Sequence, residues 1–314
     1  MKKRLLIISF CILLTMVFVG NVFARGSGQT SGEGRPQVAI VLKTLASPYW
    51  QAVLSGAREA AAQYGFDLIE LGPPTEDHVT EQINMVEDVI ARGNVAGIVF
   101  SPSQPPAAIT VLNRARAAGI PVAVIDTPMP DGFDNFLTFI GSNNYQIGVL
   151  GAQEMMKVLS QGDTVTILEG APGNVAMTQR SDGAERIFRE NGILIESRQP
   201  AFSDRERAFS IMQNILQRGD VNGIFAANDD QAVGALLALT QNNKTAVVMG
   251  VDGNRFALES VRDGGLFGTV AQDAAGMGFL GVQSIYRHLN NQPVERQIDA
   301  PTPVITRNNV AEYL

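Results

Sequence analysis

Short apolar runs alternate with longer segments of helical period from Val38 onward. The runs have the length and the β-branched content of strands, and the segments between them repeat their apolar residues at helical spacing. This alternation is typical of βαβ units, in which helices cover both faces of a parallel sheet. The first half therefore predicts strands at 38–42, 66–71, 96–100 and 121–125 and helices at 47–64, 76–92 and 105–118.

The same alternation starts again after residues 140–144. It predicts helices at 145–159, 174–191, 204–218 and 229–241 and strands at 164–168, 193–197, 223–226 and 246–249. A long helix at 274–289 follows, flanked by strand signals at 266–271 and 304–306. Two successive rounds of similar length favour two similar α/β lobes over one very wide sheet. We therefore expect two Rossmann-like lobes, each with three αβα layers and a parallel sheet.

The first 24 residues have the pattern of a secretory signal. Basic residues at positions 2–4 precede the apolar run Leu5–Phe18, and a small-residue cleavage site ends at Ala24. Gly20 and Asn21 interrupt the apolar stretch, which argues against a retained membrane anchor. The only cysteine, Cys11, lies inside the apolar run and is not placed for lipid attachment. We expect cleavage near Ala24 and a periplasmic protein without cysteine.

Charge and composition narrow the choice of partners. The formal charge is −7, and removing residues 1–24, which hold three basic and no acidic side chains, leaves −10. Such an excess of acid disfavours nucleic acid as a partner. The Gly- and Ser-rich segment 25–36 predicts a flexible tether. No later apolar stretch approaches the roughly 20 residues that a membrane span requires.

Polar and aromatic residues stand where the predicted strands end. Ligands bind beyond the carboxyl ends of strands in open parallel sheets, because loops and helix N-termini converge there. The first round places Lys43, Thr44, Ser47, Tyr49, Trp50 and Asp126 at such ends. The second round places Arg180, Asn228, Asp252 and Gln272 there.

Carboxylates, a guanidinium and amides suit a ligand with many hydroxyl groups, because they form charge-assisted hydrogen bonds. Tyr49 and Trp50 suit the apolar face of a sugar ring. Each residue also has a structural alternative. Ser47 and Asn228 could cap helices, Asp126 and Asp252 could stabilise turns, and Trp50 could belong to the core.

Several segments carry a resemblance to the bacterial periplasmic sugar-binding proteins of the ribose-binding type, whose fold is related to the core of lac-repressor-type regulators. The resemblance spans Val38 to about Ile305, and it rests on Leu45–Trp50, Gly119–Asp126, Ile140–Asn144, Gly170–Asn174 with Arg180 and Gly183, Phe225–Ala235 and Gly250–Asp252. It implies the fold of type 1 periplasmic binding proteins, with two lobes joined by three chain crossings. The N-terminal lobe is then expected at 37–142 plus 273–301, and the C-terminal lobe at 143–272 plus 302–314.

The resemblance also implies a function. Proteins of this family capture a sugar between the lobes and deliver it to the membrane permease of an ATP-driven (ABC-type) importer, and some also engage a chemoreceptor. Matched by position, the expected sugar contacts are Lys43, Ser47, Tyr49, Trp50, Asp126, Thr127, Arg180, Ser203, Asn228, Val251, Asp252 and Gln272. Lys43, Ser47, Thr127, Ser203 and Val251 depart from the residue types of a ribose binder, so a different monosaccharide or polyol is expected. The match leaves open whether Phe202 or Ser203 faces the sugar.

An enzyme, a transcription regulator and a receptor ectodomain are three alternative classes, of which the last would need a second membrane anchor. Gly276–Gly281 matches a dinucleotide fingerprint, but it lies in a predicted helix and does not open the first βα turn, so helix packing explains it better. His78 and His288 lie in charged helical surroundings, and Asp229 and Asp230 point apart on a helix. We therefore expect no catalysis, cofactor or metal.

A transcription regulator would need a DNA-reading module before the first strand, where an export signal stands instead. The hinge favours a monomer.

Overall fold

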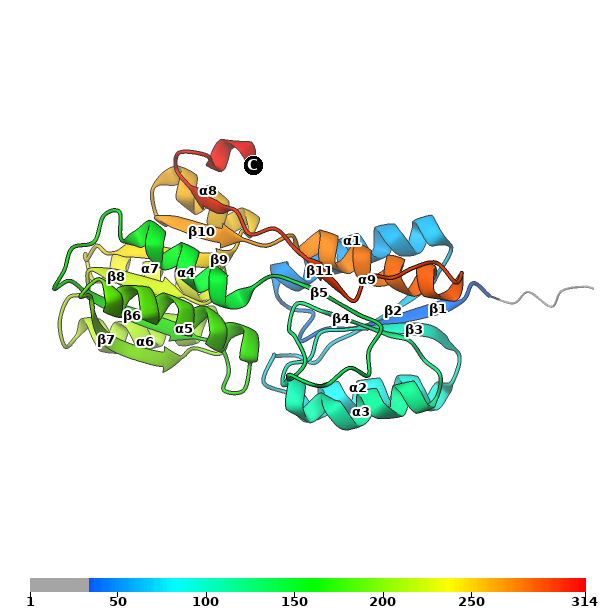
Figure 1. The fold of residues 1–314 in the computed structure, drawn as a ribbon. Coiled ribbons are helices and arrows are strands. Elements are labelled where there is room, and N and C mark those ends of the chain that lie inside the picture. The colour runs from blue at the N-terminus through cyan, green and yellow to red at the C-terminus, as the bar shows by residue number, and fades with distance from the viewer. Residues whose placement is uncertain (1–33) are drawn as a thin grey trace, which may run out of the picture. The chain divides into compact units, whose positions relative to one another are not determined.

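The computed structural model describes residues 34–314. The export signal expected at 1–24 lies outside the described residues, as does most of the tether expected at 25–36. Residues Arg35–Leu314 form one unit, and its strands make two separate six-stranded sheets. These are called sheet A and sheet B below (Figure 1).

Sheet A has the strand order β11-β5-β4-β3-β1-β2, and all its neighbouring strands pair in parallel. The chain adds strands to one side and then to the other, so the order switches between β1 and β3. Ligand crevices form at such switch points. Its strands are β1 (Gln37–Val41), β2 (Asp67–Leu71), β3 (Val95–Phe100), β4 (Val122–Ile125), β5 (Thr138–Gly141) and β11 (Gln297–Asp299).

Sheet B repeats this design in the order β12-β10-β9-β8-β6-β7. Its edge strand β12 pairs antiparallel with β10, which is the one departure from the parallel sheets that the sequence predicts. The order switches between β6 and β8, as it does between β1 and β3 in sheet A. Its strands are β6 (Thr164–Glu169), β7 (Leu194–Pro200), β8 (Gly223–Ala226), β9 (Val247–Asp252), β10 (Gly268–Ala271) and β12 (Val304–Thr306).

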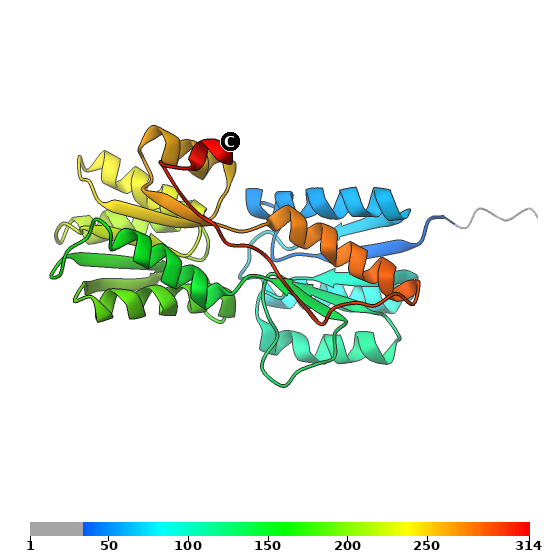
Figure 2. The same cartoon turned by 45° about the horizontal axis from the view of Figure 1, so that its top comes forward.

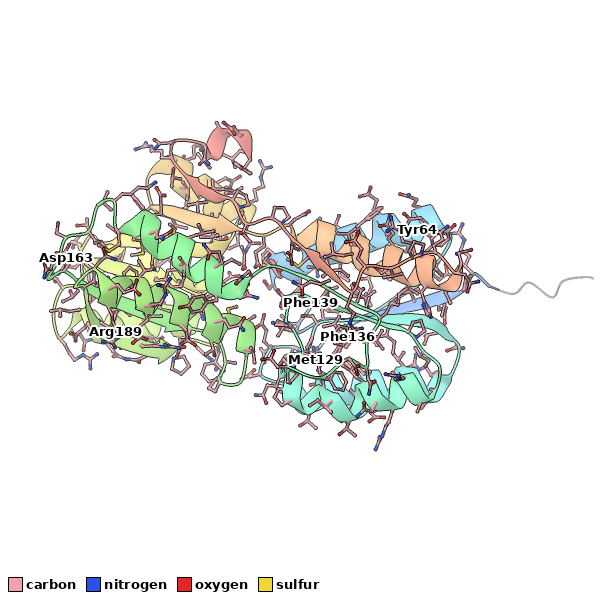
Figure 3. The ribbon with its side chains drawn as sticks, in the orientation of Figure 1. Tyr64, Met129, Phe136, Phe139, Asp163 and Arg189 are labelled. Carbon is pink, nitrogen blue, oxygen red and sulfur yellow. The ribbon has the colours of Figure 1, made fainter. Side chains whose placement is uncertain are left out.

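Helices cover both faces of each sheet, so each lobe has three layers. On sheet A, α1 (Pro48–Tyr64) and α9 (Ala274–Leu289) pack on one face, and α2 (Val79–Arg92) and α3 (Pro105–Ala117) pack on the other. Met129, Phe136 and Phe139 join the second of these cores (Figure 3). On sheet B, one face holds α4 (Asn144–Met155) and α5 (Val175–Glu190), and the other holds α6 (Arg205–Leu216), α7 (Asp229–Gln241) and α8 (Arg255–Asp263).

The glycine pattern at 276–281 serves helix packing, as predicted. It lies inside α9, which packs along α1. A Cβ atom at Gly278 would stand 1.9 Å from the carbonyl oxygen of Val53, and one at Gly56 would stand 1.9 Å from that of Ala275. Only hydrogen fits at these positions, and the two helix backbones approach closely as a result.

The chain passes between the two groups of elements three times, at residues 142–143, 272–273 and 300–303 (Figures 1 and 2). The α/β fold class with three crossings is thereby confirmed. None of the helices in residues 34–314 has the length and apolar character that crossing a bilayer would take.

The sequence prediction is wrong at several elements. It misses β5, β11 and α8, and it begins α2 at Glu76 although the helix starts at Val79. It also extends α4 to 159 although the helix ends at Met155, and it ends β7 at 197 although the strand runs to Pro200. A turn precedes α2 instead, in which the His78 amide donates to the carbonyl of Thr75 and the Thr75 hydroxyl donates to Asp77. Glu76 therefore lies in the loop after β2, which matters for the site.

Candidate ligand-binding site

Polar side chains from both sheets surround one cavity at the carboxyl ends of the strands. We call it the inner cavity, and it is lined by Lys43, Ser47, Tyr49, Trp50, Glu76, Asp126, Ala176, Met177, Arg180, Asn228 and Asp252. The loops after β1, β2 and β4 and the first turn of α1 supply the residues on the sheet A side, while α5, the N-cap of α7 and the end of β9 supply those on the sheet B side. Eight of the predicted site residues therefore meet here, from two sheets.

Three predicted residues stand behind the inner cavity or beside it. Thr127 is fully buried and accepts a hydrogen bond from Lys43 Nζ at 2.7 Å. Gln272 donates to Asp252 Oδ1 at 3.0 Å, and Ser203 donates to Glu76 Oε2 at 3.1 Å. Val251, implied by the resemblance, is fully buried in the core of sheet B and does not line the cavity.

The carboxylate of Asp126 is the centre of the sheet A side. Its Oδ2 lies 2.8 Å from Lys43 Nζ, and its Oδ1 accepts a hydrogen bond from the Tyr49 hydroxyl at 2.9 Å. Burial by itself raises the pKa of this carboxyl, but the positive charges of Lys43 and Arg180 outweigh it, so the pKa of Asp126 lies below its ordinary value. Asp126 is therefore an ionised acceptor at neutral pH.

On the sheet B side, the guanidinium of Arg180 is the central charged group. Its Nε donates to Asn144 Oδ1 at 2.8 Å, and its Nη1 donates to the carbonyl of Ala227 at 2.8 Å and to Asp252 Oδ1 at 3.3 Å. Only 2% of this large side chain is exposed. These bonds hold the guanidinium in one orientation, and none of them uses Nη2, whose two N–H groups are the donors for a ligand.

Asp252 differs from Asp126 in its electrostatics. Burial raises its pKa well above the ordinary value, and the negative charges of Asp229 and Asp126 add to that effect, while Arg180 opposes it. The Tyr49 pKa is also raised, first by burial and then by Asp126 and Asp252. The hydroxyl of Tyr49 is therefore a neutral donor.

The two aromatic residues form one wall. The rings of Tyr49 and Trp50 pack edge to face with centroids 4.9 Å apart, and the Lys43 ammonium lies 5.4 Å from the centre of the Trp50 ring. Trp50 belongs to the core of the α1 face and also lines the cavity.

Of the two residues that could cap helices, only Asn228 makes a capping hydrogen bond. Asn228 caps α7, since its Oδ1 accepts from the amide of Gln231 at 3.0 Å, and it also lines the cavity. Ser47 occupies the N-cap position of α1, but its hydroxyl makes no capping bond. The Ser47 hydroxyl therefore remains able to bond a ligand.

Glu76 is the functional candidate that the sequence analysis missed. Its Oε1 accepts from Trp50 Nε1 at 2.9 Å, and its Oε2 accepts from Ser203 at 3.1 Å and from Asn174 Nδ2 at 3.4 Å. The carboxylate thus links the loop after β2 to two residues of the sheet B lobe. Glu76 lies in the loop that follows the carboxyl end of β2, so the location of ligands beyond strand ends also points to this residue.

The two buried ion pairs of the site each lie within one lobe. Lys43 and Asp126 both belong to the sheet A lobe, and Arg180 and Asp252 both belong to the sheet B lobe. At the inner cavity the lobes contact each other through hydrogen bonds from neutral donors, such as those of Ser203 and Asn174 to Glu76. Outside this cavity, a long ion pair of 3.8 Å between Arg207 and Asp77 also joins the lobes. Separation of the lobes therefore leaves each buried charge with its partner, which avoids the cost of several kcal/mol for an isolated buried ion.

The other titratable candidates lie apart from this chemistry. His78 and His288 are exposed, and Asp229 and Asp230 make separate contacts with Thr269 and Arg205. Across residues 34–314, no cluster of three or more His, Cys, Asp or Glu side chains could hold a metal ion.

Comparison with known proteins agrees with this architecture. A periplasmic binding protein domain matches residues 38–293. The ribose import binding protein of Bacillus subtilis is 31% identical over 271 residues, which cover 86% of this chain and 87% of the relative.

Two solved structures share the fold over nearly their whole length. A solute-binding protein from Bacillus halodurans with bound myo-inositol has a TM-score of 0.82 and 30% identity, with coverage of 89% of this chain and 97% of that one. One from Actinobacillus succinogenes with bound D-allose has a TM-score of 0.82 and 30% identity, with coverage of 89% and 100%. The chain therefore belongs to the periplasmic binding protein family, and within it to the ribose-binding type.

Proposed function

We propose that this protein captures a monosaccharide or a related polyol in the inner cavity and delivers it to an ABC-type sugar importer. The observation that carries this proposal is the meeting of Asp126 from one lobe with Arg180 and Asp252 from the other around a single cavity. The relatives support the ligand class, since they include proteins that bind ribose, allose and myo-inositol. Catalysis is no part of the proposal, and the family is one of transport proteins.

The chemistry of the lining suits vicinal hydroxyl groups. An ionised carboxylate accepts two hydroxyl hydrogens, and a fixed guanidinium donates to two oxygens, so Asp126 and Arg180 can each grip a pair of hydroxyls. The Trp50 and Tyr49 rings offer an apolar surface to the C–H face of the sugar. We assign Lys43, Ser47, Asn228, Asp252 and the newly found Glu76 to further hydroxyl contacts, and Thr127, Ser203 and Gln272 to the support of those contacts.

Ligand entry requires movement. The space left among the lining side chains is about 10 Å³, roughly the room for one water molecule. We propose that the lobes, at 37–142 plus 273–301 and at 143–272 plus 302–314, hinge apart at the three crossings and close on the sugar. Pairing of the charges within each lobe supports this motion, because neither ion pair has to break.

The ligand is proposed to be a sugar other than ribose. Lys43 places a cation, and Thr127 a small hydroxyl, at positions where the resemblance implies other groups for ribose. Sites with buried hydrogen-bonding groups discriminate strongly against ligands that leave such a group unpaired. Because Lys43 bonds Asp126 and Thr127, its ammonium is fixed and contributes to that discrimination.

Location and assembly complete the proposal. Membership of the family implies the periplasm, and we propose that residues 1–24 are the signal that exports the chain. A monomeric state and a chemoreceptor as a second partner remain predictions from the sequence.

Titration calorimetry tests the proposed function. The protein without residues 1–24 is titrated with D-ribose, D-allose, myo-inositol and a set of further pentoses, hexoses and ketoses. We expect at least one sugar or polyol other than ribose to bind with micromolar affinity or better. Tight binding of ribose alone would contradict the specificity, and the absence of binding throughout the set would contradict the function.

A further inference from the structure

A second cavity adjoins the inner one at the mouth of the cleft. Its volume is about 310 Å³, and we call it the outer cavity. It is lined by Thr44, Ala46, Ser47, Pro48, Pro74, Thr75, Glu76, Phe202, Ser203, Asp204, Arg205, Glu206 and Asp230. That volume is at the small end of the roughly 300–1,000 Å³ of small-ligand pockets, a size that suits one small chemical group.

Ser47 and Glu76 belong to both cavities and mark the passage between them. Glu76 lies between its partners Trp50 on the inner side and Ser203 on the outer side. A glutamate side chain changes rotamer without backbone movement. The Glu76 side chain therefore stands at the boundary of the two cavities, next to the uncommitted hydroxyl of Ser47.

The backbone of the outer wall is held in an unusual conformation. Phe202 and Ser203 both have left-handed dihedral angles, with φ of 59° and 58°. Consecutive non-glycine residues in this region are costly, and such strain persists where the surrounding structure enforces it, often at ligand sites. Here it brings the Ser203 hydroxyl to Glu76 at the passage.

The lining of the outer cavity is polar and mainly acidic. It contains Glu76, Asp204, Glu206 and Asp230 against the single cation Arg205, which lies 2.8 Å from Asp230. Hydroxyl groups of Ser47, Thr75 and Ser203 and the apolar surfaces of Pro48 and Pro74 make up much of the rest. This mixture suits a neutral, hydroxylated or small aromatic group and repels a phosphate.

We infer that the outer cavity is a second subsite, which holds the substituent of a glycoside, or the second unit of a short oligosaccharide, whose first ring lies in the inner cavity. This inference rests on the proposed function. The passage at Ser47 and Glu76 is where the glycosidic oxygen lies, with Glu76 turned aside.

Matched pairs of ligands test the subsite. The monosaccharide that binds best in the calorimetric set is compared with its α- and β-methyl and 4-nitrophenyl glycosides. At least one anomer is expected to bind within about tenfold of the free sugar, because its substituent has a cavity to enter. If both anomers bind more than about 100-fold more weakly than the free sugar, the site is closed around a single ring and the inference is wrong.

A variant that fills the outer cavity distinguishes the contribution of this cavity to binding from that of the inner cavity. Ala46 is exposed and lines only the outer cavity. Ala46→Phe should weaken the glycoside by about tenfold or more and change the affinity for the free sugar less than about threefold, because the added ring occupies the space of the substituent. Equal weakening of both ligands would overturn the inference.

Ala117→Phe is the matched control, since Ala117 is an exposed alanine of α3 that lines neither cavity. It should leave both affinities unchanged. Binding of the free sugar without any glycoside contradicts the subsite alone. Failure of every ligand contradicts the proposed function, and the subsite with it.

Discussion

Asp126 and Asp252 occupy equivalent positions in the two lobes. Asp126 directly follows β4 and Asp252 ends β9, and these strands hold the same place in the two sheet orders. Both residues have positive φ angles, 64° and 120°, and both line the inner cavity. Their surroundings drive their pKa values in opposite directions: the pKa of Asp252 is raised, first by burial and then by Asp229, whereas at Asp126 the charges of Lys43 and Arg180 outweigh burial and lower the pKa. The equivalent strands of the two sheets thus provide two carboxyl groups whose pKa values are shifted in opposite directions.

Neutralising the first of these carboxylates should affect both stability and binding. Asp126→Asn leaves the Lys43 ammonium, which is 2% exposed, without its anion. Breaking a buried ion pair in this way costs about 3–5 kcal/mol, and we expect this loss in the free energy of unfolding measured with urea. The affinity for the sugar should fall by at least about tenfold, because a charge-assisted acceptor is lost.

An exposed ion pair provides the control for this variant. Glu70→Gln breaks the contact with Arg58, whose side chain is 51% exposed. Such surface pairs contribute about 0–1 kcal/mol. Equal unfolding free energies for Asp126→Asn and Glu70→Gln would refute the role assigned to the Lys43–Asp126 pair.

Asp229 should make stability depend on pH. This carboxyl is fully buried, and burial is the main cause that raises its pKa from 3.8 to about 7. The folded state therefore keeps a proton that the unfolded state loses near pH 4. Its contribution to the unfolding free energy is complete below pH 4 and is lost as the pH rises toward 7, by up to a few kcal/mol. The raised pKa of Asp252 acts in the same direction, whereas the lowered pKa of Asp126 acts below pH 4.

Urea unfolding between pH 4 and pH 8 measures this slope. Asp229→Asn should flatten it, because the group that titrates is gone. Asp220→Asn removes a carboxylate that is 70% exposed, and it should leave the slope as it is. A slope of the same size in Asp229→Asn as in the unchanged protein would show that another group is responsible.

The sequence predicts those elements whose own residues carry the pattern. After Gln37, β1 is a run of buried apolar residues, and α9 has its helical period throughout, so the sequence predicts the bounds of both to within a residue. β11 has one isoleucine between polar residues, and α8 is short and rich in charge. Such elements form because the rest of the lobe provides a sheet edge or an apolar face, and this context is absent from a local pattern.

The sequence predicts which residues form the site, but it does not predict the hydrogen bonds between them. The strand-end rule identified Asp126 and Arg180 as facing groups, since it depends on topology alone. It could not predict that Lys43 bonds Asp126, 83 positions away, or that Ser203 bonds Glu76, 127 positions away. These contacts depend on how two loops and two lobes meet. The wrong start of α2 has the same origin. It placed Glu76 inside a predicted helix, and this residue was therefore not recognised as a site group.

Trp50 should report ligand binding through its fluorescence. It is the only tryptophan of the chain, and its indole donates to Glu76 and packs against Tyr49. A sugar in the inner cavity changes the polarity and the hydrogen bonding around this ring, so we expect a shift in emission that saturates with the calorimetric affinity. Unchanged emission at saturation would exclude Trp50 from the site. Trp50→Phe provides the blank for the signal.

Close packing of α4 and α5 should tune the position of Arg180. A Cβ atom at Gly148 of α4 would stand 1.9 Å from the carbonyl oxygen of Arg180 itself, a contact that backbone atoms cannot tolerate. Gly148→Ala therefore pushes α5 away from α4, which should cost about 1–3 kcal/mol of unfolding free energy. The same displacement moves the guanidinium away from Asn144 and Asp252, so the affinity for the sugar should fall too.

Gly219→Ala is the matched substitution, because nothing lies within 4 Å of a Cβ atom at that position. It should change the unfolding free energy by less than about 0.5 kcal/mol and leave the affinity as it is. Calorimetry and urea unfolding on the two variants separate a local defect from a displaced ligand group. A destabilised Gly148→Ala variant that still binds the sugar with full affinity would show that the place of Arg180 is fixed by its hydrogen bonds and not by the contact between the helices.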